Sequence, residues 1–186
     1  MKKVLFTLAI VAAGLLMVSC GGKKIAAEKL TYDDYNWFSC SASVPKDKGY
    51  SFAESRPESL AELTDSKLGY LIGDKVVVEL IDFDSRSLDE WRPIITDSWP
   101  EKVVSGMKDV KVAGTDAIRI PYMIGGSTLV LYGYSYYVAA KGFDSYKSVQ
   151  INVYPLDGQP DKIADLIEDA EVKYVLSNMC FAPKDE

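Results

Sequence analysis

The sequence predicts an α+β fold in which helices flank a mainly antiparallel sheet. Short strand patterns dominate the second half of the chain, and two amphipathic helix patterns accompany them. The connections between successive strands are too short for crossovers, so neighbouring strands must run antiparallel. The 186 residues are 48% hydrophobic and 26% charged, which fits one globular domain and excludes disordered, collagenous and polytopic membrane proteins.

The first residues predict a secretory signal rather than a part of the fold. Lys2 and Lys3 form a basic start, and the apolar run over residues 4–18 is shorter than the roughly 20 residues of a membrane-spanning helix. Cys20, with a small residue before it and two glycines after it, resembles the cysteine of a bacterial lipobox. Met17 departs from that pattern, because leucine is usual there.

In such signals the cysteine is diacylated and the peptide before it, here residues 1–19, is removed. Two acyl chains give durable membrane attachment without a spanning segment, since each buried CH₂ contributes about 0.8 kcal/mol. No acidic residue closely follows Cys20, so we expect attachment to the outer membrane, facing the periplasm. Residues 20–35 are interpreted as the lipidated cysteine and a tether. The alternative is an ordinary signal peptide with an incidental cysteine.

Composition excludes several kinds of chemistry. The chain has no histidine, which rules out a Ser-His-Asp triad, a Cys-His dyad, a histidine-ligated zinc and a histidine pH switch. The net charge of −6 argues against a nucleic-acid partner. No Cys-x-x-Cys pair is present, so no redox centre or structural zinc is indicated, and no cofactor is predicted.

One domain is predicted over residues 36–186, and it opens with a half-buried strand at residues 37–45. Its apolar positions alternate with serines: Phe38, Cys40, Ala42 and Val44. Residues 58–68 fit either a short helix or an edge strand. Strands follow at residues 69–72 and 75–83, joined at a Gly-Asp pair.

The middle of the chain predicts a helix over residues 87–107. Ser87 and Glu90 have the spacing of a capping box, in which each side chain pairs with a free backbone amide. Apolar residues recur at helical spacing: Trp91, Ile94, Ile95, Trp99 and Val103. Pro100 is not tolerated inside a continuous helix, so we expect a break or kink there.

Four strands and a final helix complete the pattern. The strands are predicted at residues 110–113, 117–124, 128–140 and 148–154. A Gly-Gly pair between the second and the third indicates a hairpin. The helix is predicted from residue 160 to about Asn178, with one apolar face.

Two cysteines belong to the mature domain, Cys40 and Cys180. An exported compartment permits a disulfide between them. Cys40 also lies on the apolar side of a strand, where free thiols are commonly buried. A disulfide and two buried thiols are therefore both left open.

Three segments resemble PsbP-like domains: residues 37–46, 114–120 and 172–181. The first matches that family's phenylalanine, alternating strand and valine-proline-lysine opening. The second matches its glycine turn before a strand, and the third its final helix ending in a serine and a phenylalanine. The resemblance covers about residues 36–181 and is a pattern of strands and turns, not a catalytic motif.

This resemblance implies an α/β/α sandwich around an antiparallel sheet. It also implies a non-enzymatic role, because known PsbP-like proteins, among them an extrinsic photosystem II subunit and a Ran-binding Mog protein, mostly bind and stabilise larger assemblies. No functional residue is carried over, since this chain matches no site motif of the family. We therefore expect a protein partner at the cell envelope.

Tyr132, Tyr134 and Tyr136 face one side of a predicted strand. The opposite side is also apolar, which suits a strand buried in the core of a sheet covered on both faces. The alternative is an aromatic platform that stacks a sugar ring or docks a protein. A glycan binder would use these three tyrosines, with Trp37 or Trp99 as further candidates.

Acidic residues gather around the end of the strand predicted at residues 75–83: Glu79, Asp82, Asp84, Asp89 and Glu90. Solvated charges near a helix N-terminus explain them. A glycosidase-like Asp82–Asp84 pair and a weak calcium site are the alternatives, although the spacing fails the EF-hand template. Two Ser-x-x-Lys tetrads, at residues 43–46 and 105–108, lack the partner motifs of acyl-serine enzymes.

These observations rank three functions. The first is a lipid-anchored, non-enzymatic module that binds a protein at the cell envelope. The second is a binder of a glycan or another small ligand. The third is a hydrolase that depends on carboxylates, since the chain has no histidine.

Overall fold

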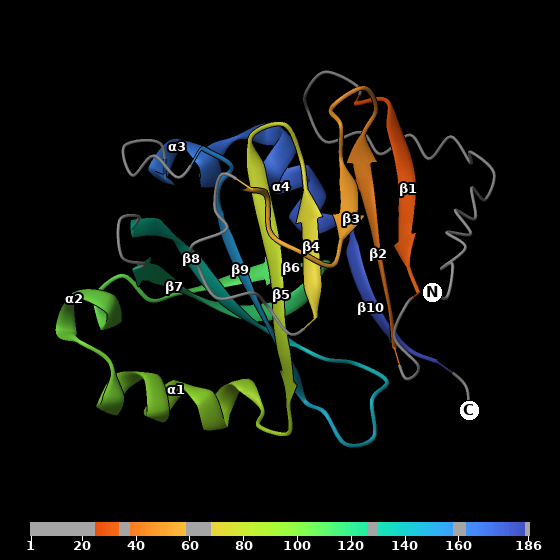
Figure 1. The fold of residues 1–186 in the computed structure, drawn as a ribbon. Helices are drawn as coiled ribbons and strands as arrows, with labels where there is room; N and C mark the ends of the chain where they lie inside the picture. Colours follow the sequence, from red (N-terminus) through yellow and green to blue (C-terminus); the bar gives the residue numbers. More distant parts are fainter. Residues whose placement is uncertain (1–24, 34–37, 59–67, 126–129, 158–162, 185–186) are drawn as a thin grey trace, which may run out of the picture.

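The chain folds into two antiparallel sheets with helices packed against them (Figure 1). The computed structural model describes residues 25–33, 38–58, 68–125, 130–157 and 163–184. The α+β class predicted from the sequence is confirmed. The predictions for Cys20, Trp37 and nearly all of residues 58–68 lie outside the described residues.

The larger sheet has seven strands in the order β3-β4-β5-β9-β8-β7-β6. Their bounds are Ser51–Ala53 (β3), Gly69–Ile72 (β4), Val76–Asp84 (β5), Lys108–Val112 (β6), Thr115–Gly125 (β7), Val130–Ala139 (β8) and Ser148–Pro155 (β9). All but β3 were predicted, with ends correct to within two residues. A strand of three residues is too short for alternation to reveal it.

The smaller sheet has the order β1-β2-β10. Its strands are Ala27–Tyr32 (β1), Phe38–Pro45 (β2) and Met179–Pro183 (β10). The interpretation of residues 20–35 as a tether is therefore wrong for β1, which pairs with β2 from Ala27 opposite Pro45 to Tyr32 opposite Cys40. Three of the six β1 residues are exposed and polar, so pairing with β2 defines this strand more than its own sequence pattern does.

Four helices are described: α1 (Leu88–Ser98), α2 (Glu101–Val104), α3 (Ile163–Glu168) and α4 (Ala170–Ser177). The predicted break at Pro100 and the Ser87–Glu90 capping box are both confirmed. The prediction of one unbroken C-terminal helix is wrong, because Asp169 ends α3 and caps α4. Its carboxylate accepts hydrogen bonds from the backbone amides of Glu171 (2.8 Å) and Val172 (3.2 Å).

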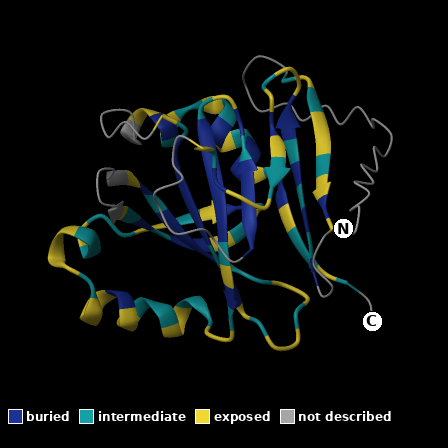
Figure 2. Ribbon diagram, in the orientation of Figure 1, coloured by how far each residue is buried: buried dark blue, intermediate teal, exposed yellow. Residues whose placement is uncertain are grey.

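Both faces of the larger sheet are covered. Ile118, Ile120 and Tyr137 pack under Ile95 of α1, and we call this side the α1 face. The other side packs against α4 and the smaller sheet, and we call it the α4 face. Figure 2 shows that buried residues concentrate in the central strands, between these layers. The main core lies on the α4 face.

Candidate functional site

The three tyrosines of the predicted ladder lie on the α4 face of β8, but they are buried to different depths. Tyr136 is 3% exposed and belongs to the main core, Tyr134 is half-buried, and Tyr132 is 37% exposed. Burial raises the pKa of the Tyr136 hydroxyl, against the opposing effect of the Arg119 cation. The core interpretation is therefore right for Tyr136, and a platform of three open rings is excluded.

The outer end of the β7–β8 hairpin carries an exposed apolar pair. Met123 is 63% exposed and lies directly opposite Tyr132 in the strand register. Farther along the hairpin, the guanidinium carbon of Arg119 lies 4.8 Å from the ring centroid of Tyr134. We call these four residues the hairpin patch. Among the described residues, Ile94 on α1 is the one other large hydrophobic side chain with comparable exposure.

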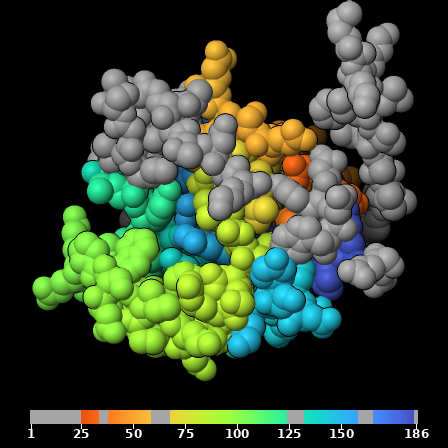
Figure 3. All heavy atoms as spheres, turned by 60° about the horizontal axis from the view of Figure 1, so that its bottom comes forward, coloured from red at the N-terminus to blue at the C-terminus, as the bar shows by residue number. Residues whose placement is uncertain are grey.

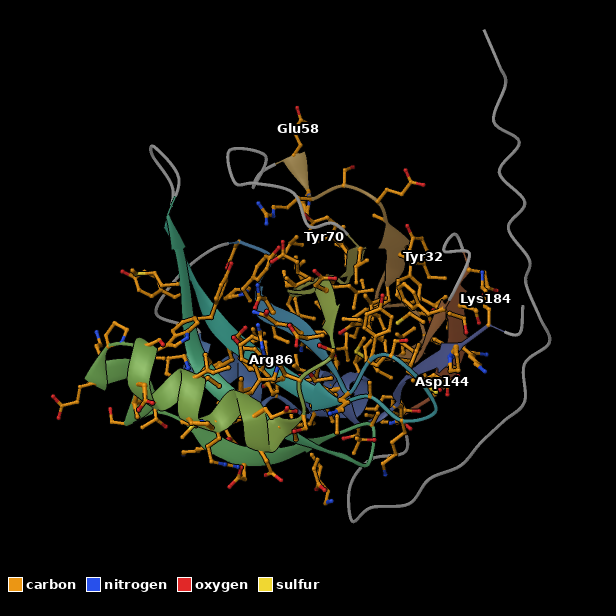
Figure 4. All side chains as sticks on the ribbon, turned by 90° about the horizontal axis from the view of Figure 1, so that it is seen from below. Tyr32, Glu58, Tyr70, Arg86, Asp144 and Lys184 are labelled. Carbon is orange, nitrogen blue, oxygen red and sulfur yellow. The ribbon has the colours of Figure 1, made fainter. Side chains whose placement is uncertain are left out.

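Asp82 and Asp84, the predicted catalytic pair, lie near the end of β5, and their carboxylates stabilise the local backbone. Asp82 accepts a hydrogen bond from the amide of Phe83 at 2.9 Å. Asp84 accepts from the amide of Arg86 at 2.7 Å and from its guanidinium at 3.2 Å. Arg86 in turn lies over Trp91 of α1, and Figure 4 shows it beside that helix. The carboxylate of Asp82 thus contacts the backbone within β5, and that of Asp84 stabilises the turn that leads into α1.

The calcium interpretation gains no support from the described part of the chain. There, no group of three or more histidine, cysteine, aspartate or glutamate side chains is placed to hold a metal ion. Glu90, one of the acidic residues considered, is used by the capping box, where it accepts hydrogen bonds from the amide and the hydroxyl of Ser87, each at 2.8 Å. These contacts lower the pKa of the Glu90 carboxyl.

Glu79 is not the solvated charge that the sequence suggested. It is 2% exposed in the middle of β5, and it accepts hydrogen bonds from the Arg56 guanidinium at 2.5 Å and the Asn152 amide at 3.1 Å. Asn152 accepts from Ser135 at 2.5 Å, and the Ser135 hydroxyl accepts from Gln150 at 3.1 Å. We call these five residues the buried polar cluster. It lies on the α1 face, beyond the area that α1 covers.

Two tyrosines, Tyr70 and Tyr154, lie beside the buried polar cluster. The guanidinium of Arg56 lies 5.6 Å from the ring centroid of Tyr70. Burial, together with the nearby Glu79 charge, raises the pKa of Tyr154. Gly133 allows β8 to lie close to the backbone of β9, since a Cβ there would be 2.3 Å from the carbonyl oxygen of Val153. Four of the five residues of the cluster are buried and Gln150 is half-buried, and the cluster joins the segment after β3 to β5, β8 and β9.

A shallow pocket of about 410 Å³ opens between the start of α1 and strands β6 and β7. Its charged lining residues are Asp89, Arg92, Asp109, Asp116 and Lys147. Arg92 pairs with Asp109 at 2.6 Å, and Asp116 pairs with Lys111 at 2.7 Å. Because these charges largely compensate one another, the pocket offers little to select a charged ligand.

Cys40 and Cys180 are free thiols on adjacent strands. Cys40 lies opposite Phe181 and Cys180 opposite Ser41, so the two thiols point to opposite faces of the smaller sheet. Cys40 is buried, which raises the pKa of its thiol, whereas Cys180 is exposed. The structure therefore contains neither the disulfide nor the two buried thiols that the sequence left open.

Comparisons with protein-family models, curated proteins and solved structures find no match to this chain. No helix in the described residues is long and apolar enough to span a bilayer. The resemblance to PsbP-like domains rests on the sequence pattern alone and stays a prediction.

Proposed function

We propose that this protein is a lipid-anchored, non-enzymatic accessory module that binds a protein partner at the cell envelope through the hairpin patch. The observation that carries the proposal is the pair of Met123 and Tyr132, 63% and 37% exposed and directly opposite each other. Scattered exposed hydrophobic residues are ordinary, whereas large contiguous apolar patches mark binding surfaces, and this pair would form part of such a patch. The anchor is the lipobox-like Cys20.

The composition of the hairpin patch favours a protein partner. Methionine, tyrosine and arginine are enriched in the centres of protein interfaces, and methionine adapts its shape to the partner. Stacking of Arg119 on Tyr134 holds both side chains in place before binding, which lowers the entropy lost in the complex. A specific interface buries about 800 Å² on each partner, so the patch forms the centre of a larger contact.

Glycan binding is the weaker alternative. With Tyr136 in the core and Tyr134 under Arg119, Tyr132 alone presents an open ring to a sugar. Trp99 packs in the hydrophobic cluster under α1, on the other face of the larger sheet. A hydrolase based on Asp82 and Asp84 is weaker still, since Arg86 engages the second carboxylate.

The same proposal includes an α/β/α sandwich of the PsbP-like kind and attachment to the outer membrane. Helices on both faces of the larger sheet support an α/β/α sandwich of the PsbP-like kind, to which the smaller sheet is added beside α4. The residues after Cys20 favour the outer membrane, with the domain facing the periplasm. Fractionation of the membranes with an antibody to the domain tests the location.

Affinity purification of the acylated protein from its native membrane, after mild crosslinking, tests the proposed function. We expect one partner at near-stoichiometric recovery. The double substitution Met123→Glu with Tyr132→Ser should reduce that recovery by roughly tenfold or more, because residues at the centre of an interface carry most of its binding energy.

Two variants serve as controls. Ile94→Glu changes an exposed hydrophobic residue outside the patch and should leave recovery unchanged. Cys20→Ala removes the proposed anchor and separates attachment to the membrane from binding of the partner. Equal recovery with the double variant, or recovery of lipid and background alone, would contradict the proposal.

A further inference from the structure

The first described strand leaves very little free chain between the proposed anchor and the fold. The backbone amide of Lys46 donates a hydrogen bond to the carbonyl of Ala26 at 2.8 Å, and β1 begins at the next residue. Six residue steps separate Cys20 from Ala26, and they span at most about 20 Å when fully extended. The tether is therefore shorter than the sequence alone suggested.

Several turns lie at the end of the domain where this tether joins it. Ala27 lies opposite Pro45, which places the β2–β3 turn over residues 46–49 at this end. The carbonyl of Lys48 accepts a hydrogen bond from the amide of Asp74 at 3.2 Å, which places the β4–β5 turn at the same end of the domain. Lys48 also pairs with Glu171 at the start of α4, at 3.4 Å. We call this the anchor end, and it is at the top of Figure 1.

The opposite end of the domain lies beyond the reach of the tether. Strand β5 runs from Val76, opposite Pro155, to Asp84, opposite Ser148. Its nine residues span roughly 25 Å. The amide of Lys147 donates to the carbonyl of Asp84 at 2.9 Å, so the β8–β9 loop lies at the far end. Figure 3, with the bottom of Figure 1 turned forward, shows α1 and this loop together at that end.

Charges at the anchor end differ in whether they have partners. Lys75 pairs with Asp169 at 2.8 Å and with Glu171 at 3.1 Å, so its charge is compensated. Lys46 and its neighbour Asp47 are exposed, and no ion pair of Lys46 occurs in the described part of the chain. The tether adds two lysines at positions 23 and 24. Cations next to an acyl anchor are attracted to anionic headgroups.

We propose that the anchor end faces the bilayer, with Lys46 against the headgroups of anionic phospholipids and the β8–β9 loop turned away. The inference rests on the proposed acylation of Cys20. An inverted arrangement would require a tether longer than the domain. A membrane-bound partner therefore meets the domain from its anchor end or its sides.

Fluorescence quenching by a lipid with a nitroxide on its headgroup tests this orientation. The acylated protein with Cys180→Ser, which leaves Cys40 buried, carries one label at Ser51→Cys near the anchor end or at Ser145→Cys in the β8–β9 loop. Both serines are exposed. In vesicles of phosphatidylcholine and phosphatidylglycerol, we expect roughly threefold or more stronger quenching at position 51, given the length of the strands between the two positions.

The controls distinguish a failure of the proposed orientation from a failure of the proposed acylation of Cys20. A flexible insert of about 20 residues after Gly22 lengthens the tether and should remove the difference between the two labels. Equal quenching on an acylated protein with its native tether overturns the orientation alone. A mass spectrum without acyl groups on Cys20 removes the anchor, and the orientation with it. If Lys46→Glu leaves quenching at position 51 unchanged, the proposed lysine–headgroup contact is wrong while the orientation stands.

Discussion

Arg56 and Glu79 form an ion pair with almost no access to water, their side chains being 1% and 2% exposed. Moving two charges out of water is costly, so such a pair contributes little compared with well-packed apolar side chains. Removing one partner is worse, because the other charge is then buried alone. The pair therefore fixes the segment after β3 onto the sheet more than it adds to stability.

Single substitutions at this pair should destabilise the domain strongly. Arg56→Met and Glu79→Gln should each lower the free energy of unfolding by about 3–5 kcal/mol, whereas the double variant should lose less than the sum of the two. Urea unfolding of the four proteins measures this coupling. The exposed Lys111–Asp116 pair is the matched control, for which no coupling is expected. Additive losses at Arg56 and Glu79 would show that the two charges do not depend on each other.

Asp169 links two elements through one carboxylate. Partial burial alone would raise its pKa, but the hydrogen bond from Lys75 and those from the amides of Val172 and Glu171 outweigh that effect, so the pKa is lowered. A carboxyl group with a lowered folded-state pKa stabilises the fold at pH values above its unfolded-state pKa of about 4. That stabilisation is lost as the pH falls through the folded-state pKa.

Asp169→Ala should therefore cost stability near neutral pH and little in acid. The expected loss at pH 7 is about 1 kcal/mol for the missing helix cap, with a further contribution from the ion pair to Lys75. The difference from the wild type should shrink as the pH falls below about 4. Urea unfolding at a series of pH values measures it, with the exposed Asp144→Ala as control. A difference that does not change with pH would contradict this account.

At the scale of elements, the pairing of β2 with β10 determines which of the two cysteine thiols is accessible to reagents. The register sends Cys40 into the core and Cys180 to solvent. We expect a maleimide to label Cys180 in the native protein and both thiols only after unfolding, and the intact mass to show two free thiols. Protection of Cys180 until a reductant is added would indicate a disulfide and contradict the register.

The sequence was sufficient where a pattern was long and periodic. The alternation of β2, the capping box of α1 and the strands β5 to β9 came from local signals, which tertiary structure preserved. Strands β1 and β10 were missed because each is defined by pairing with β2, and the two strands come from opposite ends of the sequence. The split between α3 and α4 came from Asp169, an N-cap inside an apolar pattern that looked continuous.

The candidate surface was only partly predictable. The tyrosines were singled out, but period-two alternation cannot tell that Tyr136 is buried and Tyr132 exposed along the same strand. A two-residue turn at the predicted Gly-Gly pair would place Met123 opposite Thr128, whereas the observed register places it opposite Tyr132, so the sequence could not locate this pair. Arg56 had no local signal, because its partner Glu79 lies 23 residues away.

At the scale of the whole molecule, the corrected start of the fold places the proposed anchor and partner surface on one domain. Strand β1 begins at Ala27, seven residues after the proposed anchor Cys20. Acylation at Cys20, as proposed, would hold the domain close to the membrane, where a short-range contact through the hairpin patch would benefit from a high effective concentration. This suits a weak accessory contact with another envelope protein.

Site-specific photo-crosslinking in cells tests the central claim most directly. A photoreactive phenylalanine derivative replaces Met123 in one variant and Ile94 in another, so that both probes start from exposed hydrophobic positions. We predict a discrete crosslinked product from position 123, none from position 94, and loss of the product when Tyr132→Ser is added. Products of equal yield from both positions, or none from position 123, would contradict a partner surface at the hairpin patch.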